Sequence, residues 1–298
     1  MSMKLRRVSY AMGAEVTGVD ITRPLSDEDF AAIRKALVEH CALLFRGIPL
    51  TREQYVTFGR RFGKLRDDQP GNLPDYPEIK ALIARPQKSG PLLSNFNGSD
   101  WHSDMSYTPT PIIITMLRAM QLPEVGGDTQ FANLHLAYDT LSPGMKKMLE
   151  DVEAVHMEQE SELDHSSPER LEATRKAKTT AHRLIAVHPE TGRKLLCIGD
   201  KVRLLAGMTM EESEPLLNYL RLHAQRPQFV YRHVWQKDDI ILWDQRSTNH
   251  NAIGDYDRRN ELRHLDKITL RGTAPTGNPY DDVTKARNTT EAFVYHFQ

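Results

Sequence analysis

The sequence is poor in cysteine, in long apolar runs and in net charge, and each shortage excludes a class of protein. Its 298 residues include two cysteines, Cys41 and Cys197, which are too few for a disulfide framework or a zinc cluster. No apolar run approaches the roughly 20 residues that a membrane-spanning helix needs. A formal net charge of −1 argues against binding to nucleic acid or to a membrane surface through bulk electrostatics.

The remaining composition and pattern predict a single α+β domain over residues 1–298. The chain is 39% hydrophobic and 27% charged, as in ordinary globular proteins. Capping signals predict helices that begin after Ser26, Thr51 and Ser142. Short apolar runs separated by turn residues predict many strands, which indicates a β-sandwich or jelly-roll core with flanking helices. Residues 157–181 are almost entirely polar, which fits either a solvated surface segment or a mobile lid over a pocket.

A His-x-Asp pair at His102 and Asp104 is the first candidate metal site. Residues two apart on an extended chain point the same way, so this imidazole and this carboxylate can reach one point. They would supply two-thirds of the facial triad of non-haem iron(II) enzymes. Of the four His-x-acid pairs, only this one lies between a Gly/Asn-rich loop and apolar strands. The others are His156/Glu158, which begins the polar segment and is expected to be exposed, His188/Glu190 at a proline turn, and His264/Asp266 in the last predicted strand.

His250 is the candidate third ligand. It ends the run DDIILWDQRSTNH, where a buried strand meets polar residues. A lone histidine at a strand end is more often structural, but Arg263 follows across a turn on the returning strand. A planar guanidinium there can bind a carboxylate through two hydrogen bonds, although an exposed arginine is the commoner outcome.

With these residues in place, the sequence resembles the taurine dioxygenase and 2,4-dichlorophenoxyacetate dioxygenase family of iron(II)/2-oxoglutarate enzymes. The resemblance runs from about Gly13 to Gly272 and is carried by WHSDMSY, LPEVGGDTQF, GRKLLCIG, WDQRSTNH and LRHLDKITLRG. It implies a double-stranded β-helix with flanking helices. It also implies an enzyme that uses Fe(II), 2-oxoglutarate and O2 to hydroxylate a small organic substrate, with release of succinate and CO2. The implied site residues are the iron ligands His102, Asp104 and His250, with Arg263 and Thr129 on 2-oxoglutarate.

The sequence departs from the family pattern at Lys267. Members that act on sulfonates or aryloxyacetates often have a second arginine four residues after the first, and this chain has a lysine there. Lys267 shares a strand face with Arg263, which predicts that it contacts an anionic substrate. The alternative is a lysine that reaches solvent or pairs with an acid such as Asp266 or Asp244.

Three other functions compete with the dioxygenase. A zinc-dependent hydrolase could use the same ligands but would need neither Arg263 nor Thr129. A non-catalytic small-molecule sensor could use the same scaffold. A halogenase is disfavoured because it would need a small residue in place of Asp104. The basic N-terminus lacks the apolar stretch of a signal peptide and both cysteines lie in apolar segments, so we expect a cytoplasmic protein with buried thiols. The expected partner is a small-molecule substrate, with no nucleic acid and no membrane, and a homo-oligomer is compatible with the sequence.

Overall fold

Strand β14 (Ile240–Asp244) crosses the largest sheet of the computed structural model, which describes residues 3–88, 98–158, 163–274 and 276–280. All five of its residues are buried, because apolar layers cover both faces of the sheet. The strand order is β1-β2-β3-β14-β6-β16-β5-β4. The other strands of this sheet are β1 (Lys4–Arg7), β2 (Ala14–Thr17), β3 (Ala42–Phe45), β4 (Asn72–Leu73), β5 (Tyr76–Ala84), β6 (Ile114–Gln121) and β16 (Arg263–Leu270).

Smaller sheets complete the β structure. A three-stranded sheet has the order β13-β7-β15, a four-stranded sheet has the order β12-β8-β9-β17, and β10 pairs with β11 as a hairpin. Their bounds are β7 (Thr129–Asn133), β8 (Glu153–Met157), β9 (Thr179–Arg183), β10 (Ile185–Val187), β11 (Lys194–Leu196), β12 (Val202–Leu205), β13 (Val230–His233), β15 (Thr248–Ala252) and β17 (Gly277–Pro279).

In the part of the chain that the structure describes, six α-helices and a short 3-10 helix surround the sheets. The predicted helix starts are confirmed: Ser26, Thr51 and Ser142 cap helices, and Thr51 forms a full capping box with Gln54. The helices are α1 (Asp27–His40), α2 (Arg52–Arg60), α3 (Leu134–Asp139), α4 (Pro143–Leu149), α5 (Pro168–Ala177), α6 (Met210–Ala224) and η2 (Pro227–Phe229).

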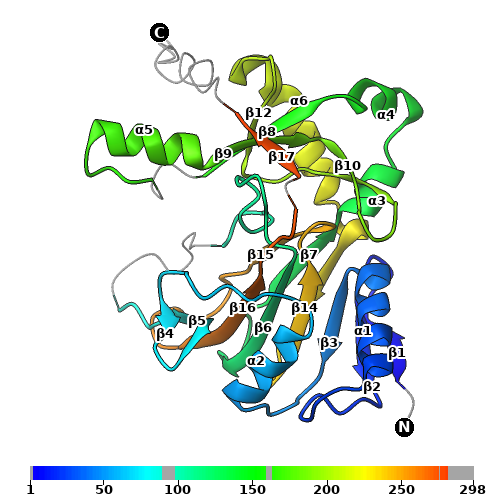
Figure 1. Cartoon of the computed structure of the whole chain (residues 1–298), viewed down its shortest axis with the longest axis vertical. Coiled ribbons are helices and arrows are strands. Elements are labelled where there is room, and N and C mark those ends of the chain that lie inside the picture. The colour runs from blue at the N-terminus through cyan, green and yellow to red at the C-terminus, as the bar shows by residue number, and fades with distance from the viewer. Residues whose placement is uncertain (1–2, 89–97, 159–162, 275, 281–298) are drawn as a thin grey trace.

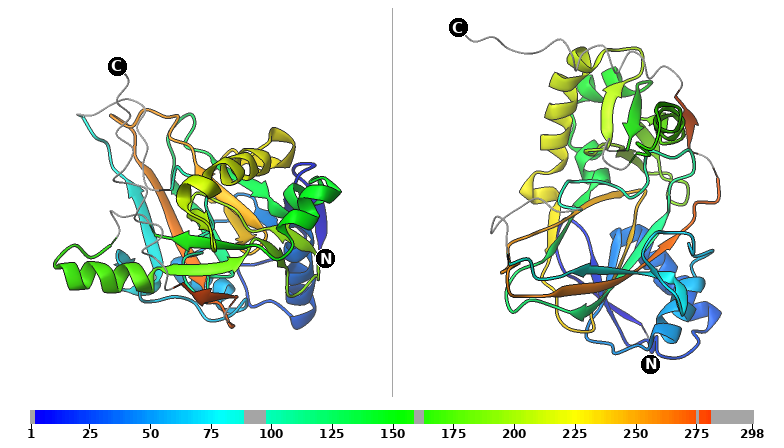
Figure 2. Two further views of the ribbon diagram at one scale, coloured as in Figure 1. Left: turned by 90° about the horizontal axis from the view of Figure 1, so that it is seen from above. Right: turned by 90° about the vertical axis from the view of Figure 1, so that its left-hand side faces the viewer.

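Two apolar layers sandwich the large sheet. Ile240 and Leu242 of β14 point into a core shared with α1 and α2, whereas Ile241 and Trp243 point into a second core. That second core includes Phe131 of the three-stranded sheet. Figure 1 shows α1 and α2 beside the large sheet, with the four-stranded sheet, α4 and α6 in the other half of the molecule. The right-hand view of Figure 2 shows the same division. The predicted β-sandwich with flanking helices is therefore present.

The polar segment 157–181 contains a helix that projects from the body. Helix α5 has no buried residue and lies at the far left of Figure 1. Residues 159–162 of the segment lie outside the described ranges. Its position fits a surface helix, and movement as a lid stays a prediction.

The two cysteines are free thiols, and the prediction that both are buried is confirmed for Cys41, whereas Cys197 is partly exposed. Burial raises the pKa of Cys41 to about 11 and that of Cys197 to about 12. In the ranges that the structure describes, no helix combines the length and the apolar character needed to cross a membrane.

Candidate metal centre

A short β-bridge places His102 beside His250. The backbone N–H of His102 donates to the carbonyl of His250 at 3.0 Å, and the N–H of His250 donates back to the carbonyl of His102 at 2.9 Å. This reciprocal pair sets the two imidazoles side by side, with ring centroids 4.3 Å apart. His250 lies on β15, and the pairing of β15 with β7 fixes the position of His250. The bridge to His250 then fixes the segment that carries His102.

Asp104 completes a cluster of three candidate ligands. Its Oδ1 lies 3.4 Å from Nε2 of His102 and 3.9 Å from Nε2 of His250. One ligand atom from each of the three residues falls within 4.8 Å of the other two. Within the described ranges, no second group of histidine, cysteine or acidic side chains meets that criterion. The structure thus brings together the three residues that the sequence singled out.

The imidazoles present lone pairs to this point. Nδ1 of His102 lies 2.6 Å from the backbone carbonyl of Asp100, and a carbonyl only accepts, so Nδ1 carries the proton. In the neutral ring, Nε2 then directs its lone pair at the carboxylate oxygen. Burial, with the nearby His102 ring, lowers the pKa of His250 well below its usual value, which keeps the His250 ring neutral. Two acceptor nitrogens and a carboxylate oxygen converge, an arrangement that a divalent cation stabilises.

The two carboxylate oxygens of Asp104 have different surroundings. Oδ1 faces the histidines, whereas Oδ2 accepts from Nε2 of Gln245 at 3.0 Å, from Oγ1 of Thr115 at 3.3 Å and from the ammonium of Lys267. Burial by itself would raise the pKa of this carboxyl, but the charge of Lys267 holds it well below its usual range. The carboxylate is therefore ionised at neutral pH.

Arg263 is a buried cation that reaches Thr129 of β7, the strand that pairs with the His250 strand β15. It is 6% exposed, and burial lowers its pKa to about 10. Its Nε donates to the carbonyl of Gly127 at 2.7 Å, and Nη2 lies 3.4 Å from Oγ1 of Thr129. Among the described residues no carboxylate forms an ion pair with it, which is unusual for a buried charge and suits an anionic ligand.

The Gly-Gly turn before Thr129 allows this approach of Arg263. Gly127 has φ +70°, and a Cβ there would lie 3.2 Å from Cδ of Arg263. Gly126 has φ +80°, and its Cβ would lie 2.2 Å from the carbonyl oxygen of Asp255. A side chain at either position would strain the backbone, and a side chain at Gly127 would also displace the arginine. Oγ1 of Thr129 also accepts from Nε1 of Trp235 at 3.1 Å, which fixes the hydroxyl next to the guanidinium.

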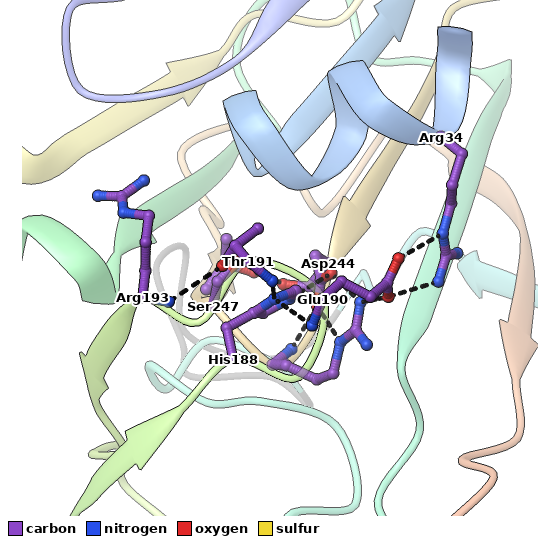
Figure 3. A network of polar contacts seen from close by, with 9 residues as sticks. Arg34, His188, Glu190, Thr191, Arg193, Asp244 and Ser247 are labelled. Atoms are coloured by element: carbon purple, nitrogen blue, oxygen red, sulfur yellow. Dashed lines mark hydrogen bonds and ion pairs between the residues drawn. The ribbon is translucent and has the colours of Figure 1, made fainter. Parts of the chain in front are cut away.

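The remaining His-x-acid pairs lie away from this cluster. His188 and Glu190 belong to a network of polar contacts with Asp244, Arg246 and Arg34, in which each charged group has an oppositely charged partner (Figure 3). His264 lies 3.0 Å from Asp266 within β16.

The expectation that the His156/Glu158 pair is exposed was wrong for both residues: the Glu158 side chain is only 8% exposed and forms an ion pair with Lys201. His156 is 3% exposed and packs on His182 and Cys197, because β8 extends through it and pairs with β9 and β12. The polar character of the following residues hid this strand.

Sequence reasoning missed the partners of Asp104. Gln245 donates to its carboxylate and accepts from its backbone N–H at 3.0 Å, and Thr115 lies on β6. Gln245 directly follows β14 and lies five residues before His250 in the sequence. Its closeness to a candidate ligand was the sequence signal that could have identified it. Lys267 was singled out, but its partner is Asp104 and neither Asp266 nor Asp244.

Comparison with known proteins identifies the family. The model for "Taurine catabolism dioxygenase TauD, TfdA family" matches residues 4–269. The chain belongs to this family. It is 32% identical to an alkylsulfatase of Acinetobacter baylyi over 92% of this chain and 87% of that protein. It is also 32% identical to an α-ketoglutarate-dependent 2,4-dichlorophenoxyacetate dioxygenase of a Burkholderia species, over 86% of this chain and 91% of that protein.

A solved structure agrees with these relatives. A taurine dioxygenase from Burkholderia xenovorans superposes with a TM-score of 0.79 at 32% identity, covering 96% of this chain and 98% of that one. As a member of this family, the dioxygenase is an oxidoreductase that uses Fe(II), 2-oxoglutarate and O2. It shares the fold of these enzymes, and neither the zinc hydrolase nor the sensor is favoured.

Proposed function

We propose that the enzyme hydroxylates an unactivated C–H bond of a small anionic substrate at a metal held by His102, Asp104 and His250. The observation that carries the proposal is the convergence of three ligand atoms within 4.8 Å of one another, close to a buried guanidinium that lacks a carboxylate partner. The donor set of two neutral imidazoles and one carboxylate suits Fe(II). The unpaired guanidinium suits the far carboxylate of 2-oxoglutarate.

Each residue then has a defined task. His102, Asp104 and His250 hold Fe(II) from one side and leave the opposite side open, and bound Fe(II) with 2-oxoglutarate and O2 supplies the oxidising chemistry. Arg263 anchors the distal carboxylate of 2-oxoglutarate, and Thr129 hydrogen-bonds to the same group. The Gly126–Gly127 turn keeps Arg263 in place, and burial excludes water, which strengthens its attraction for an anion.

Three features support an anionic substrate. The ammonium of Lys267 lies at Asp104, and Arg66 contacts the sulfur of Met105, the residue after Asp104. The relatives named above include an alkylsulfatase and a 2,4-dichlorophenoxyacetate dioxygenase. We therefore place alkyl sulfates, sulfonates and aryloxyalkanoates first among the candidate substrates, with Lys267 as a candidate substrate contact.

The proposal extends to the architecture and setting of the enzyme. The pairing of an eight-stranded with a three-stranded sheet across one apolar core supports a double-stranded β-helix within a single domain. The free thiols support a cytoplasmic location, and a homo-oligomer and the absence of nucleic-acid partners stay predictions.

Succinate release by the purified protein tests the proposal. Fe(II), 2-oxoglutarate and O2 are each omitted in turn, with a panel that spans the three anion classes and one neutral analogue of each. We expect release to need all three components and to rise with at least one anionic compound but not with its neutral analogue. Turnover that persists without O2 would instead support a hydrolase, and stimulation by the neutral analogues alone would remove the anionic substrate.

A further inference from the structure

The two carboxylate oxygens of Asp104 have different contacts. Oδ1 is the oxygen that faces both imidazoles, at 3.4 Å from His102 and 3.9 Å from His250. Oδ2 has three donors: Gln245, Thr115 and Lys267. Such an oxygen has its acceptor capacity filled by protein groups. It is not free to bind a metal that sits between Oδ1 and the histidines.

The three donors come from rigid positions in the large sheet. Thr115 lies on β6, directly opposite Thr269 of β16 and Trp243 of β14. Lys267 is on β16, two residues from Thr269 on the same face, and Gln245 directly follows β14. Nε2 of Gln245 also lies 2.8 Å from Oγ1 of Thr115, so the donors contact one another. Adjacent strands thus hold the donor set independently of any bound ligand.

We propose that Lys267, together with Gln245 and Thr115, is a positioning residue that makes Asp104 a one-oxygen metal ligand. This inference rests on the proposed function of His102, Asp104 and His250. A carboxylate that bound through both oxygens would occupy one more coordination position. The enzyme needs those positions for 2-oxoglutarate and O2, so holding Oδ2 away from the metal keeps the open side open.

The charge and burial of Lys267 suit this role. Its side chain is 16% exposed and that of Asp104 is 14% exposed, so both charges are largely removed from water and their attraction is correspondingly strong. An ammonium has three donors, so the contact with Asp104 does not prevent a contact with substrate. The two roles differ in one measurable respect: positioning acts before any substrate is present.

Water relaxation by Mn(II) tests the inference without turnover. Bound Mn(II) is paramagnetic and speeds relaxation of the water protons that exchange on it, in proportion to the number of coordinated waters. With Mn(II) as the only added ligand, Lys267→Met should let Oδ2 replace one water. The inner-sphere relaxation rate per bound ion should then fall by about a third, for an ion with about six ligands of which three are protein atoms.

Matched variants separate positioning from other effects. Lys267→Arg keeps the cation and should retain the parental rate. Lys201→Met removes a lysine of equal 16% side-chain exposure whose partner is Glu158, and it should also retain the rate. If Lys267→Met does not fold, the double variant Gln245→Leu/Thr115→Val decides, because removal of the two neutral donors should lower the rate in the same direction.

The outcomes distinguish this inference from the proposed function. A parental rate per bound Mn(II) in Lys267→Met, with a raised KM for the primary substrate alone, would assign the lysine to the substrate and overturn the positioning role. Failure of the parent protein to bind Mn(II) or Fe(II) would overturn the proposed metal site itself. A lowered rate in Lys267→Met that Lys267→Arg restores would support the inference.

Discussion

Two of the clusters that combine histidine and carboxylate side chains in the described ranges leave their polar atoms in different states. In the network of Figure 3, Nδ1 of His188 accepts from the backbone N–H groups of Glu190 and Thr191, each at 3.3 Å, and Nε2 lies 3.1 Å from Asp244. Arg246 binds both oxygens of Asp244, so the protein satisfies both His188 and Asp244, although Nη1 of Arg34 is buried without a hydrogen-bond partner.

The metal cluster keeps part of its capacity unused. Nε2 of His102 and Nε2 of His250 both face Oδ1 of Asp104, and a carboxylate oxygen cannot donate to either. Arg263 is likewise a buried cation without an ion-pair partner among the described residues. The difference shows that residue type alone does not mark a metal site. A metal site is marked by unused acceptor atoms that converge on one point. A cluster of the same residue types whose polar atoms pair with one another stabilises the fold instead.

The largest expected effect comes from breaking the open cluster. Asp104→Ala leaves two ligands, so succinate release should fall below detection, at least 1,000-fold, because the metal is no longer held in a usable geometry. Fold should be retained, as measured by circular dichroism and thermal unfolding. The control is Asp151→Ala, whose side chain is 92% exposed, and it should keep parental activity. Parental activity in Asp104→Ala, or chlorination when chloride is added to it, would refute the ligand assignment.

Breaking the closed cluster should act on stability and leave the chemistry in place. Asp244→Asn removes the buried negative charge that pairs with Arg246 and leaves Glu190 as the carboxylate partner of that arginine. The free energy of unfolding should fall by about 3–5 kcal/mol. Urea denaturation measures this loss. Fe(II) affinity of the folded fraction should change little, and a large change there would show that the two clusters are not independent.

The same variant has a pH signature. Burial alone would raise the pKa of Asp244, but Arg246 and His188 lower it well below its usual value. A lowered folded-state pKa gives stability that is fully present above the unfolded pKa of about 4 and is lost as pH falls towards the folded pKa. The stability difference between parent and Asp244→Asn should therefore shrink as pH falls below about 5. A difference that stays constant down to pH 3 would contradict the assigned ion pair.

Removing the unpaired cation should affect one ligand selectively. Arg263→Ala leaves the distal carboxylate of 2-oxoglutarate in a buried site without its partner, a loss on the order of 2–5 kcal/mol. The KM for 2-oxoglutarate should rise at least tenfold while Fe(II) affinity changes little. Thr129→Val removes a neutral contact and should give a smaller rise in the same direction. An unchanged KM in Arg263→Ala would remove this residue from the co-substrate site.

The smallest effect concerns the exposed segment that belongs to neither cluster. Helix α5 has no buried residue, so its amides should exchange with solvent faster than those of α6, which packs several buried side chains. If the segment closes over the site, exchange in α5 should slow when metal, 2-oxoglutarate and substrate are bound. Hydrogen-exchange mass spectrometry with α6 as internal reference measures both rates, and equal α5 rates in the free and loaded enzyme would leave it a plain surface helix.

Local patterns were sufficient to single out the candidate ligands because each lies in a short, distinctive run. His102 and Asp104 are two residues apart, Arg263 begins the apolar strand β16, and His250 follows the apolar strand β14, in the middle of β15. The Gly-Gly turn before Thr129 is likewise local. The same reasoning predicted the capped helices, since a cap and its first turn are sequence neighbours.

The unpredicted features depend on contacts between distant segments. Lys267 contacts Asp104 because the fold brings β16 close to the segment after His102. The sequence around either residue carries no signal of this contact. Gln245 reaches Asp104 for the same reason. His156 was misjudged because its burial depends on β9 and β12, which cover a strand whose own sequence turns polar at its end.

The bridge between His102 and His250 joins two segments that are remote in the sequence, so a metal bound as proposed would be a removable cross-link between them. Two backbone hydrogen bonds hold the junction in the absence of an ion. An ion bound to both side chains would add a third tie that exists only in the folded chain, so melting temperature should climb with the logarithm of free metal concentration. In a cell short of iron, the protein would lose both its activity and the stabilisation that the bound metal provides. Idle enzyme would then be the population most readily unfolded and degraded.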